Sequence, residues 1–150
     1  MTPIRLVPDA SVALAWLLGR TDMQESNLAR HLLEVAHASQ NLVPHIWPVE
    51  VANGMLRAER GERITEGQRL SFARLLDRLP ISADPDAATS SISRVYQLAR
   101  THGLTTYDAS YVELAWRNNA CLATFDRKLA DAARASGIAV YGQPLSLIHI

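Results

Sequence analysis

The sequence has little of what secreted and membrane proteins usually carry. No run of about eighteen apolar residues occurs in the chain, so no membrane span is expected. The N-terminus has no basic segment followed by an apolar one, so it does not read as a signal peptide. Cys121 is the single cysteine, which excludes an intramolecular disulfide. A lone thiol in an apolar run fits a reducing compartment, and we therefore expect a soluble cytoplasmic protein.

Several motifs that would define other enzyme classes are also missing. The sequence contains neither of the glycine-rich nucleotide-binding loops, Gly-x-x-x-x-Gly-Lys-Ser/Thr and Gly-x-Gly-x-x-Gly, and it lacks His-Glu-x-x-His. The histidines show no metal-ligand spacing. An aspartate-nucleophile phosphatase of the haloacid type would need a second aspartate two residues after Asp9, where Ser11 stands.

Neither positive nor negative charge is in excess, because 15 basic residues balance 15 acidic ones. A net charge of zero gives no electrostatic reason to expect a nucleic-acid partner. However, Lys128 is the only lysine, so the other basic residues are arginines. Arginine is better suited than lysine to bidentate phosphate contacts. If four acids are metal ligands, the remaining charge is 15 minus 11, or +4. Charge alone therefore decides nothing.

What is present is an apolar content of 48%, enough for one core in a chain of 150 residues. No internal repeat, low-complexity segment or linker interrupts it, so residues 1–150 are expected to form a single domain. Short β-like runs alternate with amphipathic helical stretches, which favours parallel pairing through helical crossovers. We predict an α/β fold, a three-layer α/β/α sandwich around a parallel sheet of about five strands, with strands at residues 4–7, 42–43, 81, 121–124 and 138–141.

Local signals place most of the helix starts. Ser11 is predicted to cap the first helix, and capping-box spacings occur at Thr21/Gln24 and Thr65/Gln68. Pro48 suits the first residue of the next helix, which should run to about Arg60. Three further helices are predicted, beginning at Asp84-Pro85, at Thr105 or Thr106, and after Asp126. The last of them should end at Gly137.

Four acidic residues stand where a parallel sheet places its ligands, beyond the carboxyl ends of the strands. Asp9 follows the first strand and Asp126 the fourth, whereas Glu50 and Asp108 lie in first turns of helices. Singly, such acids can be explained as helix caps or first-turn acids. Four carboxylates in one crevice would repel each other, and a divalent cation would relieve that repulsion. Hard oxygen ligands without a His-Cys cluster point to Mg²⁺ or Mn²⁺ rather than Zn²⁺.

Four segments in this order resemble the motifs of PIN domains, especially the VapC-type toxins of toxin–antitoxin pairs. They are VPDASVAL at 7–14, PVEVANGML at 48–56, TYDASY at 106–111 and LATFDRKL at 122–129. The resemblance covers essentially the whole chain. It implies a metal-dependent endoribonuclease that cleaves single-stranded regions of RNA, forms a homodimer and is held inactive by a small antitoxin protein. Pro8 is a departure, since it cannot donate a ladder hydrogen bond at the end of an interior strand.

By position in these motifs, Asp9, Glu50, Asp108 and Asp126 would be the catalytic and metal-binding acids. The resemblance also implies that Thr124 supports Asp126 or a metal-bound water. Asn53, three residues after Glu50 and on the same helical face, is a candidate for holding Glu50 or contacting RNA phosphate. Products would carry 5′-phosphate and 3′-hydroxyl ends.

Some alternatives stay open. The chain could bind RNA or a partner without cutting, although the presence of all four acids argues against this, or it could be a structure-specific DNA nuclease with the same acids. Gly54 within a helix indicates close packing, and the spacing of Tyr107 and Tyr111 favours a packed pair. The apolar end of the segment 142–150 could cover a neighbouring surface or a second subunit.

Overall fold

The computed structural model describes residues 4–85 and 91–141, and the segment 142–150 discussed above lies outside them. Five strands form one sheet in the order β3-β2-β1-β4-β5, with every neighbouring pair parallel. The predicted parallel sheet is confirmed. Its strands are β1 Arg5–Pro8, β2 Gln40–Val43, β3 Ile81–Ala83, β4 Cys121–Ala123 and β5 Val140–Tyr141.

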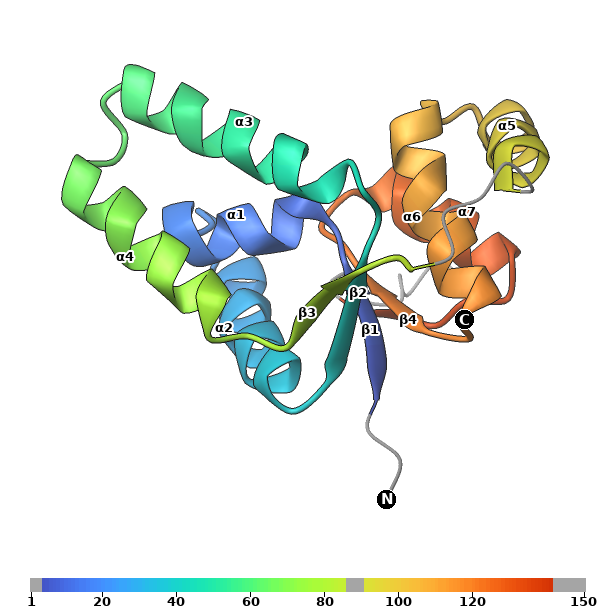
Figure 1. Ribbon diagram of the computed structural model, residues 1–150, viewed down its shortest axis with the longest axis horizontal. Coiled ribbons are helices and arrows are strands. Elements are labelled where there is room, and N and C mark those ends of the chain that lie inside the picture. The colour runs from blue at the N-terminus through green and yellow to red at the C-terminus, as the bar shows by residue number, and fades with distance from the viewer. Residues whose placement is uncertain (1–3, 86–90, 142–150) are drawn as a thin grey trace.

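Helices cover both faces of the sheet, which gives the three layers that the sequence predicted. Figure 1 shows α1 to α4 on one side of the strands and α5 to α7 on the other. The helices in the described residues are α1 Ala10–Leu18, α2 Met23–His37, α3 Trp47–Arg60, α4 Glu66–Asp77, α5 Ser91–His102, α6 Thr106–Arg117 and α7 Arg127–Ala135. None of them is long and apolar enough to cross a membrane.

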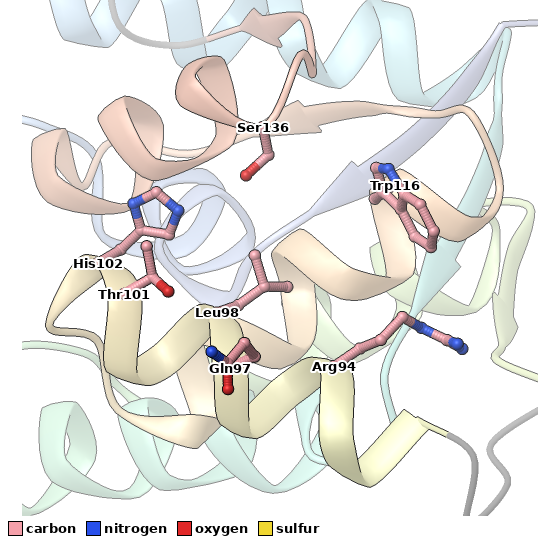
Figure 2. Close-up of a pocket in the computed structure, with 7 residues that line it drawn as sticks. All are labelled: Arg94, Gln97, Leu98, Thr101, His102, Trp116 and Ser136. Atoms are coloured by element: carbon pink, nitrogen blue, oxygen red, sulfur yellow. The ribbon is translucent and has the colours of Figure 1, made fainter.

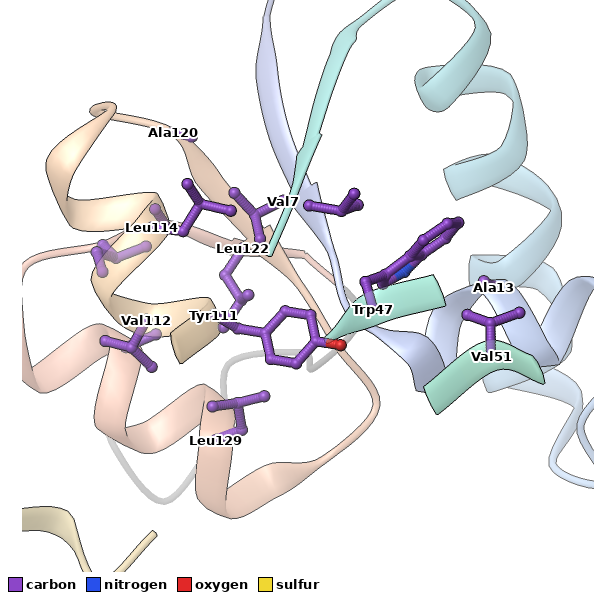
Figure 3. Packing of buried hydrophobic residues seen from close by; sticks show 14 of the residues in the cluster. Val7, Ala13, Trp47, Val51, Tyr111, Val112, Leu114, Ala120, Leu122 and Leu129 are labelled. Atoms are coloured by element: carbon purple, nitrogen blue, oxygen red, sulfur yellow. The ribbon is translucent and has the colours of Figure 1, made fainter. Parts of the chain in front are cut away.

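Alternation along β1 divides the core between the two faces of the sheet. The side chain of Leu6 packs in a cluster with residues of α1 and α2, including Leu32. The next residue, Val7, packs in a second cluster with residues of α6 and α7, and Trp47 at the start of α3 belongs to it. Figure 3 shows this second cluster, with the ring of Tyr111 near its centre.

Two of the predicted helix caps were wrong by one or two residues. The cap of α1 is Asp9, whose Oδ1 accepts the Val12 N–H at 3.1 Å, and Ser11 already lies inside the helix. The cap of α2 is Asp22 instead of Thr21. In both places an aspartate and a hydroxyl residue stand close together, and either can cap a helix. The Thr65/Gln68 capping box is confirmed by reciprocal hydrogen bonds of 3.1 and 2.8 Å.

The other predicted helix starts are close to those observed. Helix α3 begins at Trp47, one residue before Pro48, and ends at Arg60 as predicted. Thr105 caps α6, and Asp126 caps α7. The helix expected to open at Asp84-Pro85 is described from Ser91 onward, and residues 86–90 are outside the described part of the chain.

Pro8 fits at the end of β1 because no hydrogen bond of the sheet requires an N–H at this position. The β1–β2 register runs through Arg5 and Leu6, whereas on the β4 side it continues to Pro8. The Asp9 N–H donates to the Ala123 carbonyl at 3.0 Å, on the β4 side. Because successive N–H directions alternate along a strand, the nitrogen of Pro8 faces the β2 side, beyond the last paired residue there.

Gly54 allows α3 to cross close to α1, as its position predicted. A Cβ atom at residue 54 would lie 2.4 Å from Leu14 Cδ1, which is shorter than a van der Waals contact. The approach of these two helices holds the first turn of α3, and with it Glu50, over the end of the sheet.

A buried ion network ties α6 to the end of β3. The Arg117 guanidinium donates two hydrogen bonds to the Asp84 carboxylate, at 3.0 and 2.5 Å, and its Nε donates to Glu113 Oε1 at 2.9 Å. The side chains of Glu113 and Asp84 are only 3% and 6% exposed. Arg94 of α5 adds a longer contact of 3.3 Å to Glu113. These partners raise the pKa of Arg117.

Replacement of Arg117 by alanine should destabilise the fold severely, because it leaves two buried carboxylates without their main partner. Breaking such a network from one side costs about 3–5 kcal/mol in free energy of unfolding. Urea unfolding followed by circular dichroism measures the difference. Arg69→Ala is the matched control, since its ion pair with Glu59 is about one-third exposed and should be worth less than about 1 kcal/mol. Equal losses in the two variants would contradict this view of the network.

Candidate active site

The four acids lie at the topological switch point of the sheet. Strands β1 and β4 are neighbours, and the chain leaves them toward opposite edges; ligands of such sheets bind beyond the carboxyl ends of these strands. Asp9 directly follows β1, and Asp126 follows β4 by three residues. Glu50 and Asp108 lie in the first turns of α3 and α6.

Asp9 is the buried centre of this arrangement. Asp9 is only 5% exposed, and its carboxylate accepts three hydrogen bonds. Ser11 Oγ donates to Oδ1 at 2.6 Å, the Val12 N–H donates to the same oxygen, and Thr124 Oγ1 donates to Oδ2. The carboxylate is therefore held in one orientation by the first turn of α1 and by the residue that follows β4.

The two hydroxyls also hold the turn between β4 and α7. Thr124 Oγ1 accepts the Asp126 N–H at 2.9 Å, and Ser11 Oγ accepts the Phe125 N–H at 3.1 Å. Thr124 thus contacts the carboxylate of Asp9 and the backbone N–H of Asp126, and the support for Asp126 or a metal-bound water that the resemblance implied stays a prediction. The carboxylate of Asp126 caps α7 through the Leu129 N–H at 3.0 Å, and the residue is exposed.

Glu50 is held by a tyrosine from the core. The hydroxyl of Tyr111 donates to Glu50 Oε1 at 2.5 Å, and Tyr111 is 1% exposed. Figure 3 shows this hydroxyl pointing toward the start of α3 at Trp47. The spacing of Tyr107 and Tyr111 had favoured a packed pair, but their environments differ, because Tyr107 is 60% exposed. Burial and the contact with Glu50 raise the pKa of Tyr111, so its hydroxyl keeps its proton and donates.

The acids influence each other electrostatically. Burial raises the pKa of Asp9 to about 6; its three donors oppose the rise, and the charge of Asp126 adds to it. Burial also raises the pKa of Asp108, with further increases from the charges of Asp126 and Glu50, while Lys128 lowers it. The structure therefore brings all four predicted acids together. Within the described residues the side chain of Asn53 is exposed and makes no hydrogen bond to Glu50, and its contact with RNA phosphate stays a prediction.

The donor set suits a hard divalent cation. Carboxylate oxygens gather here, and Lys128 is the cation near Asp108. No group of three or more His, Cys, Asp or Glu side chains in the described ranges is already arranged as a coordination shell. The carboxylates have neighbours of like charge, and these repel one another. A cation would reverse that repulsion, so the residues fit a metal in chemistry and charge.

A separate cavity of about 310 Å³ lies between α5, α6 and the end of α7. Figure 2 shows its lining, which includes Leu98, Trp116 and Ser136. The guanidinium of Arg94 stacks over the Trp116 ring, 5.7 Å from the ring centroid. None of the four acids lines this cavity, so it is not part of the candidate active site.

Three residues with direct contacts to the acids or an effect on their charge were not found by the sequence reasoning. Ser11 was interpreted as a cap, Tyr111 as half of a packed pair, and Lys128 only as the single lysine. A hydroxyl two residues after the first acid was a usable signal for Ser11. The role of Tyr111 depends on a contact 61 residues away in the sequence, which no local pattern reveals.

Comparison with known proteins agrees with this geometry. The family model of the PIN domain matches residues 6–135. Ribonuclease VapC9 from Mycobacterium tuberculosis is 32% identical over 131 residues, covering 87% of this chain and 92% of the relative. The crystal structure of PAE2754 from Pyrobaculum aerophilum has a similar fold, with a TM-score of 0.66 at 22% identity, covering 91% of this chain and 83% of that one. The crystal structure of FitAcB from Neisseria gonorrhoeae gives a TM-score of 0.61 at 14% identity, covering 91% and 96%.

The raised pKa of Asp9 predicts how stability depends on pH without metal. The folded state binds this proton more tightly than the unfolded state, so stability falls as pH rises from about 4 to about 6. The full penalty, roughly 3 kcal/mol, is present above pH 6. Asp9→Asn should therefore be more stable than the parent at neutral pH, and its advantage should shrink toward pH 4.

Chemical denaturation in EDTA across this pH range measures the effect. Asp131→Asn is the control, because the side chain of Asp131 is 63% exposed and its charge carries little burial penalty. A constant difference between Asp9→Asn and the parent at every pH would show that Asp9 is not the group responsible.

Proposed function

This chain belongs to the PIN-domain family, and we propose that it is a Mg²⁺- or Mn²⁺-dependent endoribonuclease that cleaves single-stranded regions of RNA as the toxin of a toxin–antitoxin pair. The observation that carries the proposal is the gathering of Asp9, Glu50, Asp108 and Asp126 at the end of β1 and β4. The name of its relative VapC9, a ribonuclease, supports the choice of RNA. A small antitoxin protein and a homodimer are proposed from the same relationship.

The four acids would hold the metal through their carboxylate oxygens. When bound, a divalent ion supplies a more acidic water and stabilises the charge that develops on a phosphodiester. The chain's own residues prepare this site. Ser11 and Thr124 fix the orientation of Asp9, and Tyr111 keeps Glu50 turned toward the other acids.

Lys128 provides the positive charge at the edge of the site. It lowers the pKa of Asp108, and its Nζ lies beside the turn at Gly103, 3.5 Å from the position that a Cβ atom there would occupy. An ammonium in this place can attract an RNA phosphate toward carboxylates that would otherwise repel it. We propose that Lys128 orients the backbone of the bound strand.

The test of the proposal is cleavage of end-labelled single-stranded RNA by the purified protein in Mg²⁺, Mn²⁺ or EDTA. Activity should require the metal and should fall at least about 100-fold in Asp9→Asn and Asp126→Asn, because each change removes a ligand charge. Melting temperature should rise on addition of metal to the parent and not to these variants, since a ligand that binds the folded state stabilises it.

Asp131→Asn serves again as the matched control and should keep both the activity and the metal-induced shift, since it lies in α7 with an exposed side chain. Metal binding without cleavage of any RNA or DNA would favour a protein that binds without cutting. Cleavage of DNA in preference to RNA would replace the proposed substrate. No metal binding at all would end the catalytic interpretation.

Tyr111→Phe tests the positioning of Glu50 separately. The variant removes one hydroxyl from the core and leaves the ring, so the fold should survive with a loss of about 1.5–3 kcal/mol, typical of a hydrogen bond to a charged group. We expect kcat to fall about 10-fold or more and the metal concentration needed for half-maximal activity to rise. A purely structural role for Tyr111 would leave that metal requirement unchanged.

A further inference from the structure

An aromatic side chain stands exposed beside the acids. Tyr107 directly precedes Asp108 in the first turn of α6 and is 60% exposed. Val49, which precedes Glu50, is the other exposed apolar residue adjoining an acid, at 66%. Exposed aromatic rings lose no packing when a planar ligand stacks on them, and Tyr107 is the one next to the candidate active site.

A pocket of about 220 Å³ opens next to Tyr107. Its walls come from the β2–α3 loop at 44–46, from α5 at Val95, and from the face of α6 that carries Tyr107 and Ser110. The same loop leads into the helix of Glu50, and the same turn of α6 carries Asp108. None of the four acids lines this pocket, but Tyr107, which does, directly precedes Asp108, so the pocket lies beside the candidate active site.

The polar groups in this pocket are largely engaged within the protein. Glu113 and Asp84 are both hydrogen-bonded to Arg117. The Ser110 hydroxyl donates to the Tyr107 carbonyl at 2.6 Å. His45 and Thr106 also line the pocket and are exposed, so they could contact the edge of a ligand, while Tyr107 offers its ring for stacking.

The carboxylates of the candidate site repel RNA phosphates, so stacking would add affinity that does not depend on charge. The chain has a net charge of zero, and the candidate site gathers four carboxylates, with Lys128 as the neighbouring cation. Phosphate contacts give most RNA-binding proteins their affinity through basic surfaces. Where such a surface is weak, base stacking on aromatic rings supplies an alternative, and single strands expose their bases for it.

We propose that Tyr107 and the adjoining pocket form a subsite for one unstacked nucleobase of the RNA, next to the scissile phosphate. This inference rests on the proposed ribonuclease function and names how its substrate is held. The ring of Tyr107 stacks on the base, and Pro44 and Ile46 provide the apolar wall. Because every base has a π-face, stacking on Tyr107 accepts different bases.

The experiment compares Tyr107→Ala, Tyr107→Phe and the parent in RNA cleavage. Loss of the ring should raise KM about 5- to 100-fold, with a smaller change in kcat, whereas phenylalanine should stay within about 3-fold of the parent. Tyr96→Ala is the matched control, since Tyr96 is 54% exposed on α5 and does not line the pocket. It should leave KM unchanged. An equal metal-induced rise in melting temperature in all variants shows that the acids are intact.

Two further readouts identify stacking. A single-stranded RNA that carries 2-aminopurine should lose fluorescence on binding to the parent and to Tyr107→Phe, and not on binding to Tyr107→Ala. The ratio of affinities between Tyr107→Ala and the parent should stay constant from about 50 to about 300 mM salt, because stacking releases no counterions.

The subsite and the ribonuclease function can fail separately, because binding is measured without cleavage. If no RNA is cut while fluorescence is still quenched through Tyr107, the function fails and the base subsite stands. Unchanged KM and unchanged quenching in Tyr107→Ala overturn the subsite. An equal loss in Tyr107→Phe, or a loss that varies with salt, overturns stacking as its basis.

Discussion

The carboxylate of Asp9 and its two hydroxyl partners are the contact on which the site depends. Ser11 comes from the start of α1 and Thr124 from the end of β4, and each also accepts a backbone N–H of the β4–α7 turn. A single buried acid thereby joins the two strands that border the crevice. Without these contacts the loops after β1 and β4 would carry acids with no defined relation to each other.

The buried charge at this site lowers the stability of the folded state. Burial of an ionised carboxylate opposes folding, and the raised pKa of Asp9 expresses that cost. The neighbouring acids add repulsion instead of relief, as the raised pKa of Asp108 shows. The rest of the molecule offsets the cost elsewhere, with a continuous core on each face of the sheet and a buried network in which opposite charges are matched.

The sheet and the four acids could be predicted because their signals are local. An apolar run followed by an aspartate, as at residues 4–9, carries both the strand and the position of its acid. Caps were less certain, since at Asp9/Ser11 and Thr21/Asp22 two competent side chains stand close together. The side chains that contact the acids could not be predicted from the sequence. Tyr111 meets Glu50, and Thr124 meets Asp9, only because helices and strands distant in sequence pack together.

The order of the strands has a consequence for synthesis of the protein. Strand β1 is made first, but its neighbour β4 is the fourth strand along the chain, and the partners Asp9 and Thr124 are 115 residues apart. Domains form progressively as a chain emerges from its N-terminus. A growing polypeptide that has not reached Asp126 has half of its crevice missing, whatever else has folded. The complete set of acids therefore comes into existence only after the chain has been made through Asp126, the last of the four along the sequence.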